Sequence, residues 1–131
     1  MKKSIGVAAL LGVVCLALIP IAPVYAANWI FVNTNKDGAV FYYDSDTIQR
    51  SGNRVTIWEK TDYSRDKTTN YRQTITRYRY DCAERTSTLL QGTAYYPDGK
   101  SETFVYNNYQ QKEYALPPDS VGETMLEAVC R

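Results

Sequence analysis

The N-terminal segment constrains the chain most, because it has the three parts of a secretory signal peptide. Lys2 and Lys3 precede an uncharged, mostly apolar run from Ile5 to Ile19, and the triplet Val24-Tyr25-Ala26 ends the segment. Val24 and Ala26 suit the third and the first position before a cleavage site, where signal peptides have small residues. We therefore expect residues 1–26 to be removed before Ala27, leaving residues 27–131 to fold as one domain outside the cytoplasm.

Two other uses of this segment remain open, a retained membrane anchor and lipidation at Cys15. The apolar run is about 15 residues long, which is short for a span of about 20 residues. Gly12-Val13-Val14 is a poor match to the small-residue box that precedes a lipidated cysteine. The sequence therefore favours cleavage, with no membrane span afterwards.

Charge and length limit what the mature part can do. Without Lys2 and Lys3, the net charge of +1 becomes −1, which argues against a nucleic-acid binder driven by bulk charge. A chain of about 100 residues can form one modest core. Tyrosine is abundant, with 12 residues, and tyrosine suits both strands and binding surfaces.

Cys82 and Cys130 are the two cysteines left after Cys15 departs with the signal segment. An even pair in a small exported domain is most simply a disulfide. The alternative is a reactive redox thiol, but the chain has no CxxC motif. We therefore expect a Cys82–Cys130 bond.

The mature sequence alternates like strands, with turn signals between them. Pro97-Asp98-Gly99 is the clearest hairpin turn. Ser45 to Arg50 could form one helical turn, and Asn107 to Ala115 is ambiguous. The expected strands are residues 28–34, 39–44, 54–63, 70–82, 85–96 and 101–106.

The C-terminal residues change to a helical period. Ser120 and Glu123 have the spacing of a capping box. After them, one apolar face is formed by Val121, Met125, Ala128 and Val129. The sequence thus predicts an α+β fold: an antiparallel sheet of about six strands with one C-terminal helix, from about Val121 to Cys130, linked to the sheet by the disulfide.

The residue types argue against an enzyme and against a metal or cofactor site. The chain has no histidine, the commonest general base and metal ligand. Asp44 and Asp46 could begin a calcium loop, but the glycine and the terminal glutamate of such a loop are missing, so a capped turn is the better interpretation. Carboxylate-only catalysis remains an open alternative.

Geometry favours a binding protein. A helix of about ten residues is roughly 15 Å long and 10 Å wide. Six strands spaced about 4.8 Å apart make a sheet close to 29 Å across. Much of the sheet must then face solvent, a second copy of the chain or a ligand.

Arginines mark the candidate ligand-binding residues. Side chains alternate along a strand, so Tyr78, Tyr80 and Cys82 share the face that the disulfide draws toward the helix. Arg77 and Arg79 then project from the opposite face. With Arg85 beyond the strand end, they could form a basic stripe that meets an acidic partner. The alternative is that they are solvated charges paired with neighbouring carboxylates.

The order of several short motifs resembles the bacterial surface-adhesin protein E family. The matching stretches are Phe41-Tyr42-Tyr43-Asp44 with Thr47-Ile48, Val55-Thr56-Ile57-Trp58 with Asp62-Tyr63, Tyr78-Arg79-Tyr80-Asp81-Cys82 with Arg85, and Pro117-Pro118-Asp119-Ser120-Val121-Gly122-Glu123 with Ala128-Val129-Cys130.

This resemblance implies an antiparallel sheet whose C-terminal helix is held by the disulfide. It also implies binding to host matrix and plasma proteins such as vitronectin, laminin and plasminogen. We expect an exported, non-enzymatic binding protein at the cell surface or in the periplasm. The second hypothesis is a periplasmic structural or accessory domain whose open sheet serves a homodimer or an envelope complex.

Overall fold

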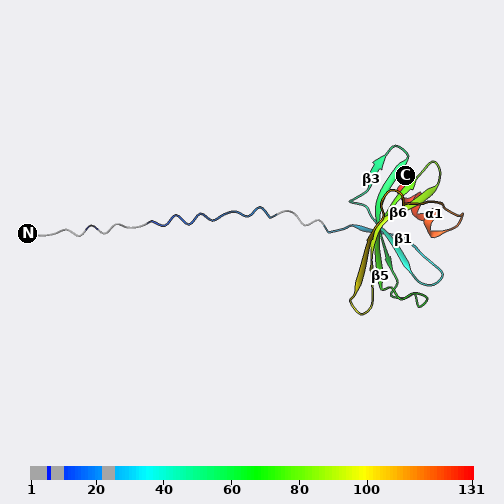
Figure 1. Cartoon of the computed structure of the whole chain (residues 1–131), viewed down its shortest axis with the longest axis horizontal. Coiled ribbons are helices and arrows are strands. Elements are labelled where there is room, and N and C mark those ends of the chain that lie inside the picture. Colours follow the sequence, from blue (N-terminus) through cyan, green and yellow to red (C-terminus); the bar gives the residue numbers. More distant parts are fainter. Residues whose placement is uncertain (1–5, 7–10, 22–25) are drawn as a thin grey trace, which may run out of the picture.

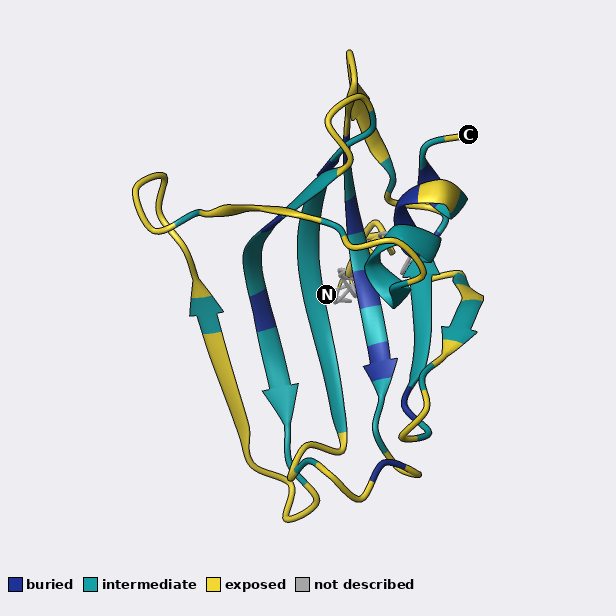
Figure 2. Cartoon of the chain, turned by 90° about the vertical axis from the view of Figure 1, so that its right-hand side faces the viewer, coloured by how far each residue is buried: buried dark blue, intermediate teal, exposed yellow. Residues whose placement is uncertain are grey.

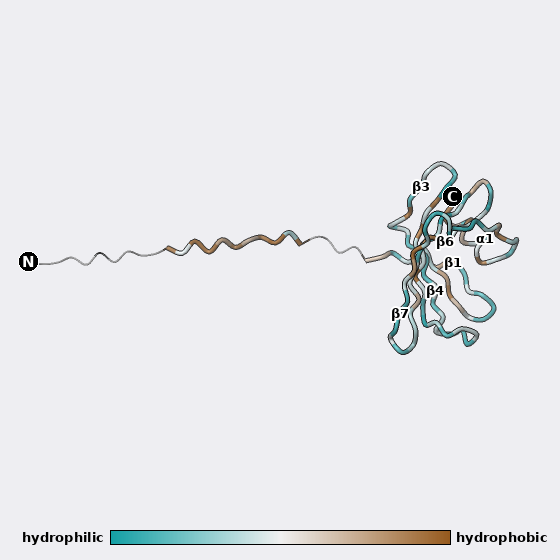
Figure 3. The backbone as a smooth tube through the Cα atoms, in the orientation of Figure 1, coloured by the Kyte–Doolittle hydropathy of each residue, from teal (hydrophilic) through white to brown (hydrophobic). Residues whose placement is uncertain are grey.

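The computed structural model describes residue 6 and residues 11–21 and 26–131 of the chain. Residues 11–21 are exposed, have no regular secondary structure and run away from the folded domain (Figure 1). Their apolar character is visible in brown in Figure 3. Lys2, Lys3, Val24 and Tyr25 of the predicted signal segment lie outside the described residues. Within the described part of the chain, no helix has the length and apolar character to cross a membrane.

The folded domain consists of one antiparallel sheet and one helix, as the sequence predicts. In chain order, the elements are β1 (Trp29–Thr34), β2 (Val40–Asp44), β3 (Gln49–Ser51), β4 (Arg54–Asp62), β5 (Gln73–Asp81), β6 (Thr86–Tyr95), β7 (Ser101–Val105), β8 (Glu113–Ala115) and α1 (Val121–Val129). The six strands predicted from the sequence are all present, and β3 and β8 are short additions to them.

Six strands form the body of the sheet, in the order β1-β2-β4-β5-β6-β7. The two short strands pair with the free ends of longer ones: β3 lies beside the start of β4, and β8 beside the start of β6. Thus β2 and β3 share one edge of β4, and β7 and β8 share one edge of β6. The ambiguous segment Asn107 to Ala115 therefore ends as a strand.

The helical turn considered for Ser45 to Arg50 is wrong. The Asp44 carboxylate accepts a hydrogen bond from the Asp46 backbone N–H at 3.1 Å and another from the Thr47 hydroxyl at 2.7 Å. These bonds hold a tight turn rather than a helix. The chain then continues into β3, which returns to β4 through Gly52 at a φ of 57°. The capped turn predicted at Asp44 is confirmed.

Side-chain alternation divides the sheet into two faces. Along β4, Val55, Ile57, Glu59 and Thr61 are buried, whereas the residues between them are partly exposed. The buried set faces α1. Figure 2 shows α1 lying over one part of the sheet, and β7, at the edge farthest from β1, remains mostly exposed.

The core lies between this face and the helix. Val55, Ile57 and Tyr80 of the sheet pack with Met125, Leu126 and Val129 of α1. Tyr78 and Cys82 pack against this cluster, which confirms the predicted face of β5. Of the predicted helix face, Met125 and Val129 are buried, and Leu126 joins them.

The two ends of α1 are fixed to the rest of the fold. At its start, the Ser120 hydroxyl accepts a hydrogen bond from the Glu123 backbone N–H at 3.1 Å, which is one half of the predicted capping box. The Glu123 carboxylate accepts from the backbone N–H of Asp119 rather than from that of Ser120. At its end, Cys130 is bonded to Cys82, with 5.7 Å between their Cα atoms. The predicted disulfide is therefore confirmed.

Candidate binding face

The face of the sheet opposite α1 carries aromatic and basic side chains. We call it the helix-free face, and its aromatic and basic residues, with Thr56, are Trp29, Phe31, Tyr42, Arg54, Thr56, Trp58, Lys60, Arg77 and Arg79. Both tryptophans of the chain are among them. The acidic residues Asp62, Asp81 and Glu113 lie on the same face. Trp58 lies directly opposite Arg77 in the β4–β5 register, and Thr56 lies opposite Arg79.

Arg77 and Arg79 project from this face, as the alternation of β5 predicts. The β4–β5 register runs without a shift from Arg54 to Asp62. The irregularity beside Arg77 belongs to β6, where Leu90 is the extra residue between the partners of Arg77 and Tyr78. Both arginines therefore keep the orientation opposite to Tyr78 and Tyr80.

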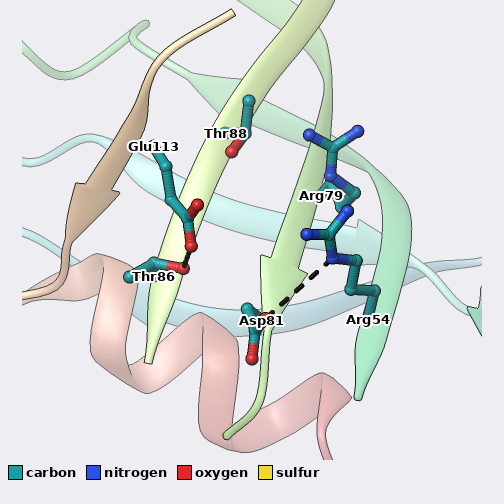
Figure 4. A pocket seen from close by; sticks show the side chains of 6 residues that line it. All are labelled: Arg54, Arg79, Asp81, Thr86, Thr88 and Glu113. Carbon is teal, nitrogen blue, oxygen red and sulfur yellow. Dashed lines mark hydrogen bonds and ion pairs between the residues drawn. The ribbon is translucent and has the colours of Figure 1, made fainter. Parts of the chain in front are cut away.

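Neither of these arginines is paired with a carboxylate among the described residues. The Arg77 guanidinium donates a hydrogen bond to the Gln49 side-chain oxygen of β3 at 2.8 Å. Arg79 stands beside Arg54, whose Nε lies 4.0 Å from Asp81 Oδ2 (Figure 4). The hollow in this figure has a volume of about 10 Å³, so it has room for about one water molecule. Contacts here must be made by the surface itself.

Aromatic rings hold the neighbouring cation in place. The ammonium of Lys60 lies 4.8 Å from the ring centroid of Trp29 and 4.6 Å from that of Tyr42. Such cation–π contacts are worth about 0.5–1 kcal/mol at exposed sites. Phe31, which is 59% exposed, packs edge-on against Tyr42. This end of the face is thus both positively charged and apolar.

Arg85 lies elsewhere. Its guanidinium reaches α1, with 3.3 Å between Nη2 and Glu123 Oε2 and 3.4 Å between Nη2 and Glu127 Oε1. Its backbone has a φ of 55° at the turn between β5 and β6. The structure therefore brings Arg77 and Arg79 together on one face and directs Arg85 to the helix side.

Two further features were not identified from the sequence. Tyr106, Tyr109 and Tyr114 line an open groove near β7 and β8, where Tyr109 is 86% exposed. The second feature is Glu59, which is 7% exposed on the core face of β4. Its local signal is an acidic residue at the place where the alternation of Val55 and Ile57 requires an apolar one.

Burial changes the ionisation of Glu59. Loss of contact with water raises the pKa of its carboxyl from 4.5 to about 7, and the hydrogen bond from the Tyr80 hydroxyl opposes this rise. Burial also raises the pKa of Tyr78 to about 12, with smaller contributions from Glu59 and from neighbouring tyrosines. Within the described residues, no group of three metal-ligating side chains comes together.

Comparison with known proteins agrees with this architecture. The sequence has no significant match among curated proteins. Crystal form II of Haemophilus influenzae protein E is similar, with a TM-score of 0.55 and 17% identity over 86% of this chain and 94% of that one. The selenomethionine form of the same protein gives a TM-score of 0.54, also at 17% identity, over 86% and 92% of the two chains.

These structural matches establish a shared fold. A family model is more specific, because it is built from sequences. The model described as surface-adhesin protein E matches residues 29–131, which include every strand and the helix. The chain therefore belongs to the surface-adhesin protein E family.

Proposed function

We propose that the mature domain is an exported, non-catalytic binding protein, and that its helix-free face binds an acidic surface on a partner protein. The observation that carries this proposal is the placement of Arg77 and Arg79, next to Trp58 and without a carboxylate partner among the described residues. Arginine and the large aromatic residues are the types most enriched at interface hot spots.

Membership of an adhesin family supports host proteins as partners. The candidate host partners that the family resemblance implies are vitronectin, laminin and plasminogen. Family membership also favours the cell surface as the location of the protein. Electrostatic attraction between a basic face and an acidic partner increases the association rate and weakens with salt. The wild-type interaction should therefore lose affinity as the ionic strength rises.

A charge-reversal experiment tests this function. The double variant Arg77→Glu, Arg79→Glu and the wild type are compared on sensor surfaces coated with each of the three host proteins. We expect the variant to fold normally and to bind at least about 10-fold more weakly, because two contacts of hot-spot type are reversed. The loop variant Arg65→Glu, Lys67→Glu makes the same change in net charge at exposed positions and is the matched control.

An equal loss of affinity in the two double variants would mean that binding depends on net charge alone and not on the position of the arginines. Unchanged affinity in the Arg77 and Arg79 variant would make these residues solvated surface charges. If the wild type binds none of the three proteins, the assignment to these host partners is wrong.

The β7 edge of the sheet favours a second candidate function, self-association or assembly within the envelope. Among the residues that the structure describes, β7 pairs with β6 on one side only, and Val105 on it is 69% exposed. An unpaired edge can add a strand from a second copy of the chain. Light scattering during gel filtration measures the mass in solution, and protease treatment of intact cells distinguishes a surface protein from a protected periplasmic one. A protected dimer that Thr103→Pro converts to a monomer would favour this alternative.

A further inference from the structure

A cavity of about 180 Å³ lies between the start of α1 and the core face of the sheet. Phe41, Tyr78 and Tyr80 line it from the sheet, Val121 and Met125 line it from the helix, and Glu59 is the acidic residue in its wall. The cavity is thus aromatic and apolar, with one carboxyl group.

The Glu59 carboxyl has one oxygen engaged in a hydrogen bond within the described residues. Its Oε1 accepts a hydrogen bond from the Tyr80 hydroxyl. Among the described residues, no other hydrogen bond to this carboxyl is found, and no buried side-chain oxygen lacks a partner. Its Oε2 must therefore be accessible, and the cavity is the space that Glu59 lines.

No cationic side chain of the described residues pairs with Glu59. From β5 the titratable groups that face it are Tyr78 and Tyr80, and from β2 its register partner is Tyr43. The helix residues that line the cavity, Val121, Gly122 and Met125, carry no charge. A buried carboxylate without a cation is costly, so it either takes up a proton or pairs with a ligand that supplies the opposite charge.

We propose that this cavity binds an alkylammonium group, which donates a hydrogen bond to Glu59 Oε2 and lies against the rings of Tyr78, Tyr80 and Phe41. Charge-assisted hydrogen bonds are about twice as strong as neutral ones. The faces of aromatic rings attract cations, and they also accept an alkyl chain. The Glu59 carboxylate would repel an anionic ligand, and a purely apolar ligand would leave Oε2 without a hydrogen-bond partner.

The alkylammonium group could belong to a free amine or to a lysine side chain of another protein. Three probes separate these sources: n-butylammonium chloride tests the shared chemistry, cadaverine represents a free diamine, and Nα-acetyl-lysine N-methylamide represents a lysine within a polypeptide. Tighter binding of cadaverine identifies a free amine, and tighter binding of the lysine derivative identifies a protein side chain. This site lies on the opposite side of the sheet from Arg77 and Arg79, so its test is independent of the proposed function.

Calorimetric titration of the folded, exported protein at pH 8 measures these affinities, with n-butanol and sodium butyrate as neutral and anionic controls. We expect a Kd on the order of 1 mM for n-butylammonium and no measurable binding of the two controls. Carboxyl ¹³C NMR of glutamate-labelled protein locates the site, because the Glu59 resonance should shift on titration. Binding should weaken as the pH falls below about 7, where Glu59 becomes protonated.

Two variants and a matched control decide the outcome. Glu59→Gln keeps the acceptor for Tyr80 but removes the charge, and it should weaken binding by at least about 10-fold. Ser87→Leu projects a larger side chain into the cavity from β6 without altering Glu59, and it should also weaken binding. Glu84→Gln, at an exposed turn position, should bind like the wild type. The proposal would be overturned if none of the three ammonium probes binds, or if Glu59→Gln binds them as tightly as the wild type. The cavity would then hold water only.

Discussion

At the scale of single residues, Glu59 is an acid in a position that the alternation of β4 gives to core side chains. A carboxyl whose pKa is higher in the folded state than in the unfolded state binds protons preferentially in the folded state. Its contribution to stability is then fully present below the unfolded pKa and is lost as the pH rises through the folded pKa. For Glu59 this window extends from pH 4.5 to about 7.

The Glu59→Gln variant should remove this pH dependence. Urea denaturation at pH 4.5 and at pH 8 measures the free energy of unfolding of both proteins. Between these values, the wild type should lose about 3 kcal/mol more than the variant, because each unit of pKa shift corresponds to about 1.4 kcal/mol. Parallel pH profiles for the two proteins would show that the folded state does not raise the Glu59 pKa.

The arginines demonstrate how far single residues can be placed from the sequence. Alternation alone puts Arg77 and Arg79 on the face opposite Tyr78 and Tyr80, and the structure agrees. Alternation does not reveal that Arg85 turns toward Glu123 and Glu127, which are about 40 positions away in the sequence. Contacts of that range depend on the tertiary fold.

At the scale of elements, the disulfide and the N-cap fix the two ends of α1. Cys82 and Cys130 are separated by 48 positions. In the chain-entropy model, such a crosslink is worth about 4 kcal/mol. The cap at Ser120 is worth about 1 kcal/mol.

The double variant Cys82→Ser, Cys130→Ser should therefore melt more than about 10 °C below the wild type. Circular dichroism during heating measures the Tm, and the helical signal should decrease as α1 loosens from β5. Ser120→Ala is the comparison, with a shift several times smaller. A double variant whose Tm lies within about 2 °C of the wild-type value would refute a stabilising role for the disulfide, because so small a difference corresponds to almost no change in stability.

Elements with strong local signals could be predicted from the sequence. The long strands β4, β5 and β6 have the composition and turn signals of strands, and α1 has its cap and its apolar period. The three-residue strands β3 and β8 have no comparable signal, because pairing with the ends of β4 and β6 is what makes them strands. The prediction of a helical turn after Asp44 was wrong for a local reason, because the Asp44 carboxylate accepts hydrogen bonds from Asp46 and Thr47 and so stabilises a tight turn.

The candidate site is predictable to the same limited degree. The sequence indicates a basic stripe, but it does not fix the strand register that places Trp58 opposite Arg77 or brings Lys60 between Trp29 and Tyr42. The cavity beside Glu59 depends on the packing of α1 over the sheet. The arrangement of the helix-free face and the shape of the cavity both depend on the packing of segments that are far apart in the sequence.

At the scale of the whole molecule, a small domain has a helix on one side of its sheet and an aromatic, basic surface on the other. Family membership places it among surface adhesins. We expect the exported protein to begin at Ala27, because the preceding residues have the parts of a cleavable signal. Mass spectrometry of the protein from its native host tests this expectation, and a mass that includes Met1 through Cys15 would contradict it.

Both tryptophans of the chain, Trp29 and Trp58, lie on the helix-free face. They therefore report directly on whether a partner covers that face. Protein labelled with 5-fluorotryptophan gives one ¹⁹F resonance for each residue, and Trp58→Phe assigns the two signals. An unlabelled partner adds no signal of its own.

The most direct test of the account is a ¹⁹F NMR titration of this labelled protein with vitronectin. If the helix-free face is the binding surface, the resonance of Trp58 should shift or broaden in step with complex formation, and that of Trp29 should follow. The effect should be absent when Arg77→Glu, Arg79→Glu protein is titrated. Formation of a complex while both resonances stay unchanged would place the binding surface elsewhere on the molecule and contradict the account.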